Sequence, residues 1–345
     1  MAKTWISCMF ITIVFSQFSH TYTTWSVNNF MMAGQKASAL FSKSAAAGGL
    51  MAVEECHHQF MWDQWNCPKE SISLYSENHL PTAIREVAFL YSIISAGVMY
   101  TLTLNCSMGH FKTCSCDSSK SGSKGDKDWN WGGCSDNVVF GEKASKQYID
   151  NLETGVDERA IVNLHNNEAG RRAVRRTLKL TCKCHGVSGS CSIRTCWKEL
   201  PEFRTVGDYL KRKYFRAVMV DARNGQLRKG NSVQRRDERD ILQISKQDLV
   251  YLEHSPNFCT ANSDYGTSGA IGRACSRPSV RHSENRWERK SCNRLCKSCG
   301  LKVKQVSVSE TSTCNCQFHW CCEVKCDNCT KIVEKFTCIP RSSST

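Results

Sequence analysis

The sequence predicts an α+β, disulfide-rich fold: an N-terminal helical domain followed by a C-terminal cysteine-rich domain built on a β-hairpin. The first observation is that 23 of the 345 residues are cysteine, a density typical of disulfide-bonded proteins in an oxidising compartment. The second is their distribution, because ten lie from Cys56 to Cys196, twelve lie from Cys259 to Cys338, and none lies between. The third is the apolar period, which is helical in the first half and alternating in the second.

Residues 1–23 have the pattern of a secretory signal peptide. Lys3 supplies the positive charge, an apolar stretch of about 14 residues follows, and Thr21 and Thr23 are small residues suited to a cleavage site. Removing this segment removes Cys8 and leaves 22 of the 23 cysteines, an even number that would form eleven disulfides. No later stretch stays apolar and uncharged over about 18 residues, so we expect no transmembrane helix.

Residues 24–221 form the predicted N-terminal domain. Pro81 suits the start of a helix, and the apolar residues that follow recur at helical spacing over most faces, which predicts a buried core helix. From Phe140 to about Leu180 helix formers return, with a break near Gly155. The periodic apolar positions of the core helix are Ile84, Val87, Ala88, Tyr91, Ile94, Val98 and Leu102.

Residues 182–197 are predicted to form a stapled hairpin that projects from this domain. Cys184 with Cys191 would close a small loop, and Cys182 with Cys196 would close a larger loop around it. Glycines on both sides of the tip permit a tight turn. The hairpin would therefore hold one hydroxyl, that of Ser188, at a fixed position.

Four interpretations of Ser188 remain open on the residues alone. A hydrolase nucleophile is disfavoured, because Gly186-Val187-Ser188-Gly189-Ser190 places the second glycine one position early for the G-x-S-x-G elbow. Cysteines spaced as Cys-x-Cys can bind zinc, but an oxidising compartment favours disulfides. The remaining interpretations are a structural hairpin with an ordinary serine, and an attachment or contact point for a partner.

The formal charge of +14, with 46 Lys and Arg against 32 Asp and Glu, predicts an anionic partner or simply a basic surface. In a secreted protein sulfated glycans are better candidates than nucleic acid. Four basic residues recur at helical spacing and would form one stripe on a helix. The stripe can be interpreted, with equal justification, as a patch for glycans or an acidic partner or as a solvated face. The stripe consists of Arg172, Arg175, Arg176 and Lys179.

Two sequons, Asn105-Cys106-Ser107 and Asn328-Cys329-Thr330, predict N-glycosylation in a secreted chain. We expect Asn105 to lie in a surface turn just after a helix. The cysteine in the middle of each sequon weakens both predictions, and early disulfide closure would block Asn328 in particular. Asn105 is therefore the stronger candidate.

The second half of the chain is divided into an exposed basic linker, residues 222–258, and a cysteine-rich domain, residues 259–345. Alternating tracts at 301–308 and 331–336 predict strands, and disulfides would supply stability that a small core cannot. In the first half, two further local pairings are plausible, Cys56 with Cys67 and Cys116 with Cys134, the second stapling the loop between them.

Four blocks of this chain resemble signatures of the Wnt family of secreted signalling proteins. Residues 182–191 read Cys-Lys-Cys-His-Gly-Val-Ser-Gly-Ser-Cys, and Thr-Cys-Trp follows at 195–197. Residues 131–137 read Trp-Gly-Gly-Cys-Ser-Asp-Asn, and residues 164–171 read Leu-His-Asn-Asn-Glu-Ala-Gly-Arg. Residues 318–322 read Phe-His-Trp-Cys-Cys. The tracts 25–30 and 95–102 resemble the eighth Wnt subfamily most.

The resemblance implies a helical thumb and a cysteine-knitted index finger that grip the cysteine-rich domain of Frizzled receptors. Ser188 would carry a mono-unsaturated fatty acyl ester added by the acyltransferase Porcupine, and the acylated hairpin would enter a groove of the receptor. An exposed aromatic at the second tip is a good binding anchor, although Trp320 could instead be buried under neighbouring strands. The implied receptor-binding residues are Val187, Ser188, Gly189, Phe318, His319, Trp320, Cys321, Cys322, Glu323 and Val324.

The resemblance also implies the C-terminal disulfides and so completes the expected cysteine pairing. It implies no metal ligands, no cofactor and no catalytic residues, since Wnt proteins are not enzymes. Cys106 with Cys114 is a further predicted pair. The pairs implied in the C-terminal domain are Cys259–Cys299, Cys275–Cys292, Cys296–Cys338, Cys314–Cys329, Cys316–Cys326 and the adjacent Cys321–Cys322.

The function implied by the resemblance is activation of Wnt signalling in developmental patterning and cell fate. The implied partners are Frizzled, low-density-lipoprotein-receptor-related coreceptors, the carrier Wntless and heparan sulfate proteoglycans, with no nucleic acid. The protein would be secreted and held at membranes or glycans of the extracellular matrix. The alternative is a glycan-binding matrix protein without lipid-dependent signalling, for which Ser188→Ala would leave activity intact.

Overall fold

The computed structural model describes residues 35–76, 80, 83–125, 129–223, 226–229, 244–277, 286–320 and 322–341. The chain divides into two compact units, which are described separately. Unit 1 comprises Met1–Cys56 and Thr82–Ser255, and unit 2 comprises His57–Pro81 and Pro256–Thr345. The predicted signal peptide, residues 1–23, lies outside the described residues.

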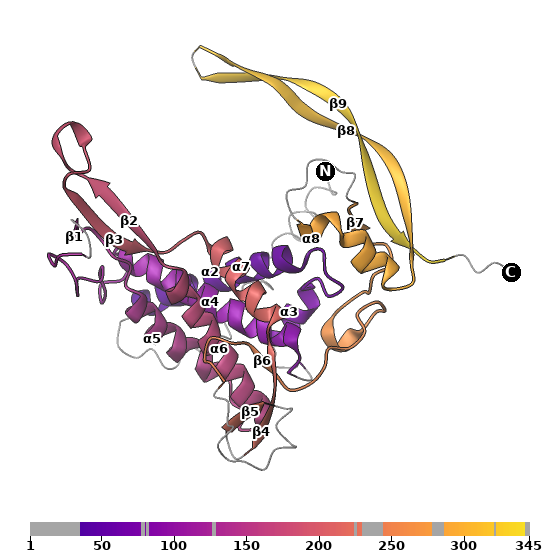
Figure 1. Cartoon of the computed structure of the whole chain (residues 1–345), viewed down its shortest axis with the longest axis horizontal. Helices are drawn as coiled ribbons and strands as arrows, with labels where there is room; N and C mark the ends of the chain where they lie inside the picture. The colour runs from indigo at the N-terminus through magenta and orange to yellow at the C-terminus, as the bar shows by residue number, and fades with distance from the viewer. Residues whose placement is uncertain are drawn as a thin grey trace, which may run out of the picture. The chain divides into compact units, whose positions relative to one another are not determined.

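Unit 1 is a helical bundle around one central helix, α4 (Figure 1). Helices α5, α6 and α7 all contact α4, and the apolar spacing that predicts a core helix is confirmed, because 18 residues of α4 are buried. By length and composition α4 could cross a membrane, but 89% of its most apolar window is buried inside the protein. The helices of the bundle are α2 (Gln35–Phe60), α4 (Arg85–Ser107), α5 (Val138–Ile149), η2 (Asp150–Leu152), α6 (Glu158–Thr177) and α7 (Phe203–Phe215). The last residues of α2, 57–60, belong to unit 2.

Glycines allow helices to approach α4 more closely than larger residues would. A Cβ atom on Gly170 of α6 would overlap the carbonyl group of Ser92 on α4. Gly48 of α2 and Gly97 of α4 face each other in the same way, each lying against the carbonyl oxygen of the other. Because these contacts are with backbone atoms, which cannot swing aside, the axes of these helices could not stay this close with any other residue there.

Unit 1 also carries two small sheets. One has the order β1-β3-β2, with β1 (Trp129–Trp131) parallel to β3 (Arg194–Glu199) and β2 (Lys179–Cys184) antiparallel to it. The other has the order β5-β4-β6, formed by β4 (Val218–Arg223), β5 (Gln226–Lys229) and β6 (Val250–Tyr251).

The prediction that residues 222–258 form an exposed linker is wrong for its described part. Leu249 and Val250 are fully buried, and β6 pairs with β4 in parallel through Val218 and Val250. Val250 joins a small apolar cluster with Ala83, Val162 and Val220. A short apolar tract at the end of a polar run is thus enough to anchor residues 249–250 in unit 1. Residues 230–243, which include Arg235, Arg236 and Arg239 of the predicted basic linker, lie outside the described residues.

Unit 2 has a small core from which a long β-hairpin extends. The two hairpin strands, β8 (Lys302–His319) and β9 (Glu323–Ile339), pair antiparallel over nearly their whole length, and β7 (Ala274–Cys275) pairs with the base of β9. The other elements of the unit are α3 (Lys69–Ser76), η6 (Ser263–Tyr265), α8 (Arg286–Arg289) and η7 (Asn293–Lys297). The core is formed by Cys275, Cys292, Leu295, Cys296, Phe336 and Cys338. The predicted strands are present but longer than the alternating tracts.

Residues 57–81, which the sequence places in the N-terminal domain, belong to unit 2. The Arg273 guanidinium donates to the carbonyl oxygens of Gln64 at 2.6 Å and Met61 at 2.9 Å. The Arg294 guanidinium pairs with the Asp63 carboxylate at 2.9 Å. Cysteine spacing predicts pairing within each half of the chain, but it does not reveal a segment held by arginine hydrogen bonds.

The structure contains nine of the predicted disulfides. They are Cys106–Cys114, Cys116–Cys134, Cys182–Cys196, Cys184–Cys191, Cys259–Cys299, Cys275–Cys292, Cys296–Cys338, Cys314–Cys329 and Cys316–Cys326. Cys56 and Cys67 are both disulfide-bonded, and their mutual pairing stays a prediction.

The predicted adjacent pair Cys321–Cys322 is not formed, because Cys322 is an exposed free thiol; Cys321 lies outside the described residues.

Candidate functional site

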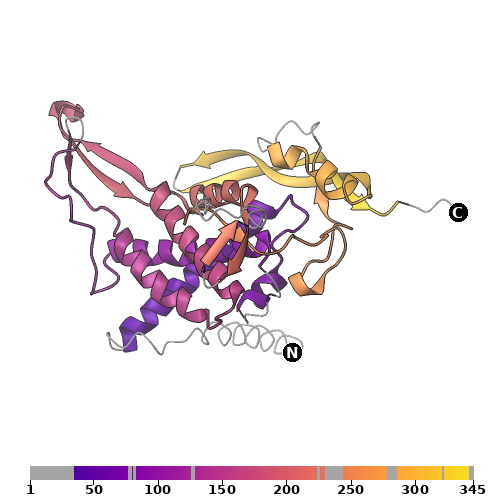
Figure 2. The ribbon, with the colours of Figure 1, turned by 60° about the horizontal axis from the view of Figure 1, so that its bottom comes forward.

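The first candidate site is the tip of the β2–β3 hairpin, which projects from the helices of unit 1 (Figures 1 and 2). Cys182 and Cys196 lie directly opposite each other in the ladder, and their disulfide forms the inner rung. Cys184–Cys191 forms the outer rung, next to the tip. A two-stranded ribbon is marginal by itself, so these two covalent rungs give the tip its fixed shape.

The tip is a single turn of 3-10 helix, Val187–Gly189. Hydrogen bonds from Gly186 N to Ser190 O at 2.8 Å and from Gly189 N to Gly186 O at 2.9 Å close it. Ser188 has φ 54° and ψ 29°, a left-handed conformation that is costly for a residue other than glycine. The strained residue of the turn is therefore the serine that the sequence singled out.

Gly186 makes this turn possible because it has no side chain, not because it adopts a positive φ. A Cβ atom there would overlap the hydroxyls of Ser190 and Ser192 and approach the Ser190 carbonyl oxygen to 2.5 Å. Gly189 has φ 77°, with nothing near the position of a Cβ. The two tip glycines thus have different roles, one steric and one conformational.

The tip presents a hydroxyl among apolar side chains. Ser188 is exposed, Val187 is 89% exposed, and Ile193 is 59% exposed. Among the described residues, the Ser188 hydroxyl has no hydrogen-bond partner, so no base activates it as a hydrolase would require. An unpartnered hydroxyl beside exposed apolar groups instead suits a covalent attachment point or a contact with an apolar surface.

Residues 131–137, which resemble a family block, support the base of this hairpin. Leu200 N donates to the Asp136 carboxylate at 2.6 Å, and Asp136 N donates to the Lys198 carbonyl oxygen at 2.8 Å. Gly133 has φ 67° and lies under the Trp197 ring. The Cys116–Cys134 disulfide closes the segment that contains β1, and β1 pairs with β3, so β1 supports the base of the hairpin.

Residues 164–171 of α6 resemble another family block, and several of their side chains make specific hydrogen bonds to the chain around them. The Asn166 side chain acts as a ladder partner for β6, donating to the Val250 carbonyl oxygen at 2.9 Å and accepting from Val250 N at 3.0 Å. His165 Nε2 lies 2.9 Å from the Asp248 carbonyl oxygen. Burial lowers the pKa of His165 below its ordinary value. This face of α6 therefore holds β6 against the bundle.

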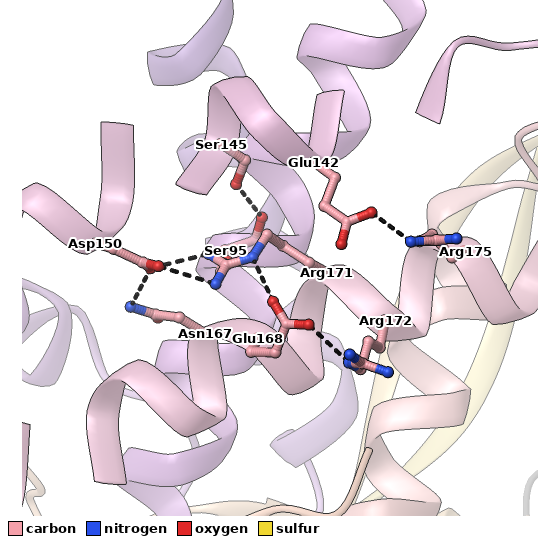
Figure 3. Close-up of polar contacts among 9 residues, drawn as sticks. All are labelled: Ser95, Glu142, Ser145, Asp150, Asn167, Glu168, Arg171, Arg172 and Arg175. Carbon is pink, nitrogen blue, oxygen red and sulfur yellow. Dashed lines mark hydrogen bonds and ion pairs between the residues drawn. The ribbon is translucent and has the colours of Figure 1, made fainter. Parts of the chain in front are cut away.

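Arg171 joins α6 to Asp150 and to α4, a structural role that the sequence does not predict (Figure 3). The side chain is 1% exposed, and its guanidinium makes a bidentate ion pair with Asp150 at 2.9 and 3.0 Å. It also donates to Glu168 at 3.2 Å and to the Ser95 hydroxyl of α4 at 3.3 Å. An arginine among other arginines of a polar helix gives no sequence signal of burial, because its partner Asp150 lies 21 residues away.

The predicted cation stripe of α6 is largely neutralised. Arg172 pairs with Glu168 at 2.7 Å, and Arg175 pairs with Glu142 of α5 at 2.6 Å (Figure 3). Lys179 is not on the helix at all, since it lies in β2 and pairs with Glu199 at 3.1 Å. These pairings favour the interpretation of the stripe as a solvated face.

The second candidate site is the tip of the β8–β9 hairpin in unit 2. Two disulfides, Cys314–Cys329 and Cys316–Cys326, cross the ribbon at a β-bulge in β8 that lies between Cys314 and Gln317. A bulge increases the local twist. The ladder continues beyond it, so that Phe318 lies opposite Val324.

This tip exposes large apolar side chains. Trp320 is 94% exposed, Phe318 is 71% exposed, and Val324 is 61% exposed. The alternative that Trp320 is buried under neighbouring strands is therefore wrong. His319 and Glu323 are paired across the ladder and exposed. Exposed aromatic side chains on a rigid ribbon are typical of a protein-binding anchor.

One cysteine cluster at the base of unit 2 has the spacing of a metal site. The sulfur atoms of Cys275, Cys296 and Cys338 lie within 4.8 Å of one another. They belong to two disulfides, Cys275–Cys292 and Cys296–Cys338, and a disulfide sulfur lacks the thiolate charge that binds zinc. The cluster is a packed pair of disulfides in the core of unit 2.

The two sequon asparagines lie in different environments. Asn105 is half-buried in the last turn of α4 rather than in a surface turn after it. Its Nδ2 donates to the Ser44 hydroxyl at 2.8 Å. Asn328 lies in β9 opposite Thr313 and is exposed.

Comparison with known proteins shows to which family this architecture belongs. The model of the Wnt family matches residues 29–339. Protein Wnt-8b of Danio rerio is 52% identical over 320 residues, covering 92% of this chain and 88% of that protein. Protein Wnt-8a of Homo sapiens is 51% identical, covering 92% of this chain and 90% of that protein. The solved structure of "Human WLS in complex with WNT8A" gives a TM-score of 0.67 at 47% identity, covering 91% of this chain and 100% of that chain. The chain belongs to the Wnt family, is most similar to Wnt-8 proteins among these relatives, and is a signalling ligand rather than an enzyme.

Proposed function

We propose that this chain is a secreted ligand of the cysteine-rich domain of Frizzled receptors that activates Wnt signalling through two stapled hairpin tips. The observation that carries the proposal is the β2–β3 tip. It holds Ser188 exposed, in a left-handed conformation, beyond two disulfide rungs. Nothing in the packing of the described residues of unit 1 requires a serine there, so a function outside the fold accounts for it best.

Ser188 would carry a mono-unsaturated fatty acyl ester. In the transfer, which Porcupine would catalyse, Ser188 Oγ loses its proton and bonds to the acyl carbon of a thioester donor, whose C–S bond breaks to release the thiol. The exposed Val187 and Ile193 would then flank the chain as it enters an apolar receptor groove. Burying about a dozen methylenes at ~0.8 kcal/mol each gives on the order of 10 kcal/mol before association costs.

The second contact is the β8–β9 tip, residues 318–324. Trp320 and Phe318 offer a large apolar area at low conformational cost, as binding anchors do. Cys322 would take part in this contact as a free thiol at the turn rather than as half of an adjacent disulfide.

Further partners follow from the same proposal. The solved relative is bound to human WLS, and an acylated chain of this family needs such a carrier because the acyl group is poorly soluble. Low-density-lipoprotein-receptor-related coreceptors would complete the receptor complex. The formal charge of +14 favours retention on heparan sulfate at the cell surface and in the matrix.

The test is the mass of the tryptic peptide Cys184–Arg194 from secreted protein, together with binding to an isolated Frizzled cysteine-rich domain. We expect an added mass near that of a mono-unsaturated C16 acyl chain. Ser188→Ala should lose both the mass and most of the binding. Ser190→Ala is the matched control, because it removes a neighbouring tip hydroxyl without removing the attachment atom.

Two results would contradict the proposal. An unmodified Ser188 in protein that still binds and signals would exclude the lipid mechanism. Full activity of Ser188→Ala with loss of matrix retention on removal of heparan sulfate would favour the glycan-binding matrix protein instead.

A further inference from the structure

We propose that the tip of the β2–β3 hairpin enters the surface of an anionic phospholipid bilayer end-on. Val187 and Ile193 would lie at the boundary of the hydrocarbon, and Lys183 and Arg194 would lie among the headgroups. The contact uses the protein's own side chains, so it does not need an acyl group on Ser188. It goes beyond the proposed function, because it gives the tip a partner other than the receptor.

The end of the hairpin is apolar over a short length. Residues 185–193 extend beyond the last ladder pair, Cys184 and Arg194, and contain no Asp or Glu. Within them Val187 is 89% exposed and Ile193 is 59% exposed. Apolar faces of segments that lie on a membrane enter it by about 5–10 Å, a depth that a single turn can reach.

The backbone of the tip is already hydrogen-bonded, which lowers the cost of leaving water. Four of its amides donate to carbonyl oxygens within residues 185–193, at distances of 2.8 to 3.1 Å. An unpaired backbone amide is costly in an apolar phase because no water is there to accept from it. The four donors are the amides of His185, Gly186, Gly189 and Ser190.

Unpaired cations follow directly behind the apolar end. Arg194 belongs to the first ladder pair after the tip, and Lys183 belongs to the second. Neither forms an ion pair among the described residues, whereas Lys179 at the base is paired with Glu199 at 3.1 Å. Four cations against one acid give residues 179–199 a net charge of +3. Anionic lipid headgroups attract basic segments of this kind. The four cations are Lys179, Lys183, Arg194 and Lys198.

Two tryptophans of β1 lie beside these cations. Trp129 is in register with Arg194 on the neighbouring strand β3, and Trp131 follows two residues later. Their rings are 4.7 Å apart and half-exposed, and Lys120 Nζ lies 4.8 Å from the centre of the Trp131 ring. Tryptophan is enriched where hydrocarbon meets headgroups. The sequence of groups along the hairpin, apolar first and then cationic and aromatic, therefore matches the sequence of layers at a bilayer surface.

The test measures flotation of the full-length chain with lipid vesicles. The chain carries Ser188→Gly, which removes the attachment atom and suits the left-handed φ of 54°; Ser188→Ala is a second unacylated form. Both are purified from cell extracts, so that secretion is not required. We expect binding to vesicles of phosphatidylcholine and phosphatidylserine and weaker binding to phosphatidylcholine alone. No binding of either form to the anionic vesicles would overturn the proposal.

Lys183→Gln, made in the Ser188→Gly chain, tests the cations. It should lower partitioning onto the anionic vesicles about fivefold and leave partitioning onto neutral vesicles unchanged. Lys179→Gln is the matched control, because it removes the same charge from the same face of β2 about 13 Å further from the tip. That distance exceeds the Debye length of about 10 Å at 0.1 M salt. Equal losses in the two variants would overturn the placement of the tip among the headgroups.

Ile193→Ser tests the apolar end. It should lower partitioning onto both kinds of vesicle, whereas Leu180→Ser, at a residue that is 49% exposed at the base of the same ribbon, should not. Equal effects of the two substitutions would overturn end-on entry.

Hydrogen exchange locates the contact independently of any substitution at the apolar end. Anionic vesicles should slow exchange in residues 185–193 and leave residues 318–324 unchanged. Slower exchange confined to residues 318–324 would assign the bilayer contact to the other tip and overturn the proposal. Because the chain used cannot be acylated, none of these outcomes decides receptor binding, which is tested with acylated protein.

Discussion

Ser188 and Gly186 show how single residues set the first tip. Substituting Gly186 by alanine should open the turn, because the new Cβ would overlap the Ser190 and Ser192 hydroxyls and crowd the Ser190 carbonyl group. Overpacking of this kind costs about 1–3 kcal/mol. We expect Gly186→Ala to reduce acylation of Ser188, measured as the acylated fraction of the Cys184–Arg194 peptide.

Gly189→Ala is the matched control for this prediction. Its φ of 77° is unfavourable for alanine, but no atom lies within 4 Å of the new Cβ, so we expect only the conformational cost of about 1 kcal/mol. The prediction is wrong if the acylated fraction falls equally in the two variants, since steric closure would then have no special importance.

His165 makes unit 1 sensitive to acid. Burial lowers its pKa below the ordinary value of 6.5, and the Asp248 carbonyl accepts from Nε2, which therefore carries the proton of the neutral ring. As pH falls through 6.5, the unfolded imidazole binds a proton that the folded one excludes. The free energy of unfolding must then fall until the lowered folded pKa is reached.

The groups that face His165 are Asp248, Glu168 and Lys246. Denaturant midpoints measured from pH 7.5 down to about 5 should show this fall in wild type. His165→Gln keeps a donor for the Asp248 carbonyl but does not titrate, so its midpoints should fall less steeply. His185→Gln, at an exposed position of the hairpin, is the control. Identical slopes in wild type and His165→Gln would contradict the assignment.

At the scale of elements, α6 is held to the bundle by a buried guanidinium. Arg171→Met removes the ion pair with Asp150 and leaves that carboxylate without its partner. Breaking a buried pair from one side costs about 3–5 kcal/mol. We expect a correspondingly lower free energy of unfolding and reduced secretion, measured by denaturation and by yield.

Arg175→Met provides the comparison for Arg171. Its side chain is 52% exposed and pairs with Glu142 at the surface, so the expected loss is at most about 1 kcal/mol. Arg171→Lys should fall between the two, because lysine keeps the charge but cannot form the bidentate pair. A loss for Arg175→Met as large as that for Arg171→Met would show that the buried geometry does not matter.

Elements also show what the sequence could and could not predict. Helix α4, the nested rungs of the β2–β3 hairpin and the two long strands follow from apolar period and cysteine spacing, which are local signals. Strand β1 was expected to be part of a loop, because its three residues pair with a strand more than 60 residues away. Burial of Arg171 and pairing of Asn166 with β6 depend on contacts over 21 and 84 residues. Such contacts leave no pattern in a window of sequence.

The same distinction holds for the candidate site. Ser188 was identified because symmetric cysteines and flanking glycines surround it within 16 residues, and Trp320 because the family block marks it. The left-handed φ of Ser188 could not be foreseen, since serine at that position has no propensity for it. The free thiol of Cys322 differs from the bond with Cys321 that the family resemblance implies, and no local pattern in the sequence indicates it.

At the scale of the whole molecule, the chain leaves unit 1 after Cys56, returns at Thr82 and leaves again after Ser255. Unit 2 is therefore assembled from two separated segments, and its folding requires that residues 57–81 find residues 256–345. Local contacts cannot achieve this, and closing so long a loop carries an entropic cost. Arg273 and Arg294, which both contact the earlier segment, are positioned to offset it.

Arg273→Met tests this role. Burial lowers the pKa of Arg273, and its guanidinium donates to the carbonyl oxygens of Met61 and Gln64. Methionine keeps most of the volume but leaves both carbonyls without this donor. The Gln64 bond is partly buried and the Met61 bond is exposed, so the cost of about 1–3 kcal/mol for an unsatisfied buried group is an upper bound for the first carbonyl and does not apply to the second. We expect faster hydrogen exchange across residues 57–67 and little change in α6 of unit 1, measured by mass spectrometry on the intact chain. Lys297→Met, an exposed substitution in the same unit, should leave exchange unchanged. If exchange in residues 57–67 is the same in wild type and Arg273→Met, then the arginine does not hold the segment, and the Asp63–Arg294 pair and the apolar contacts of unit 2 must suffice.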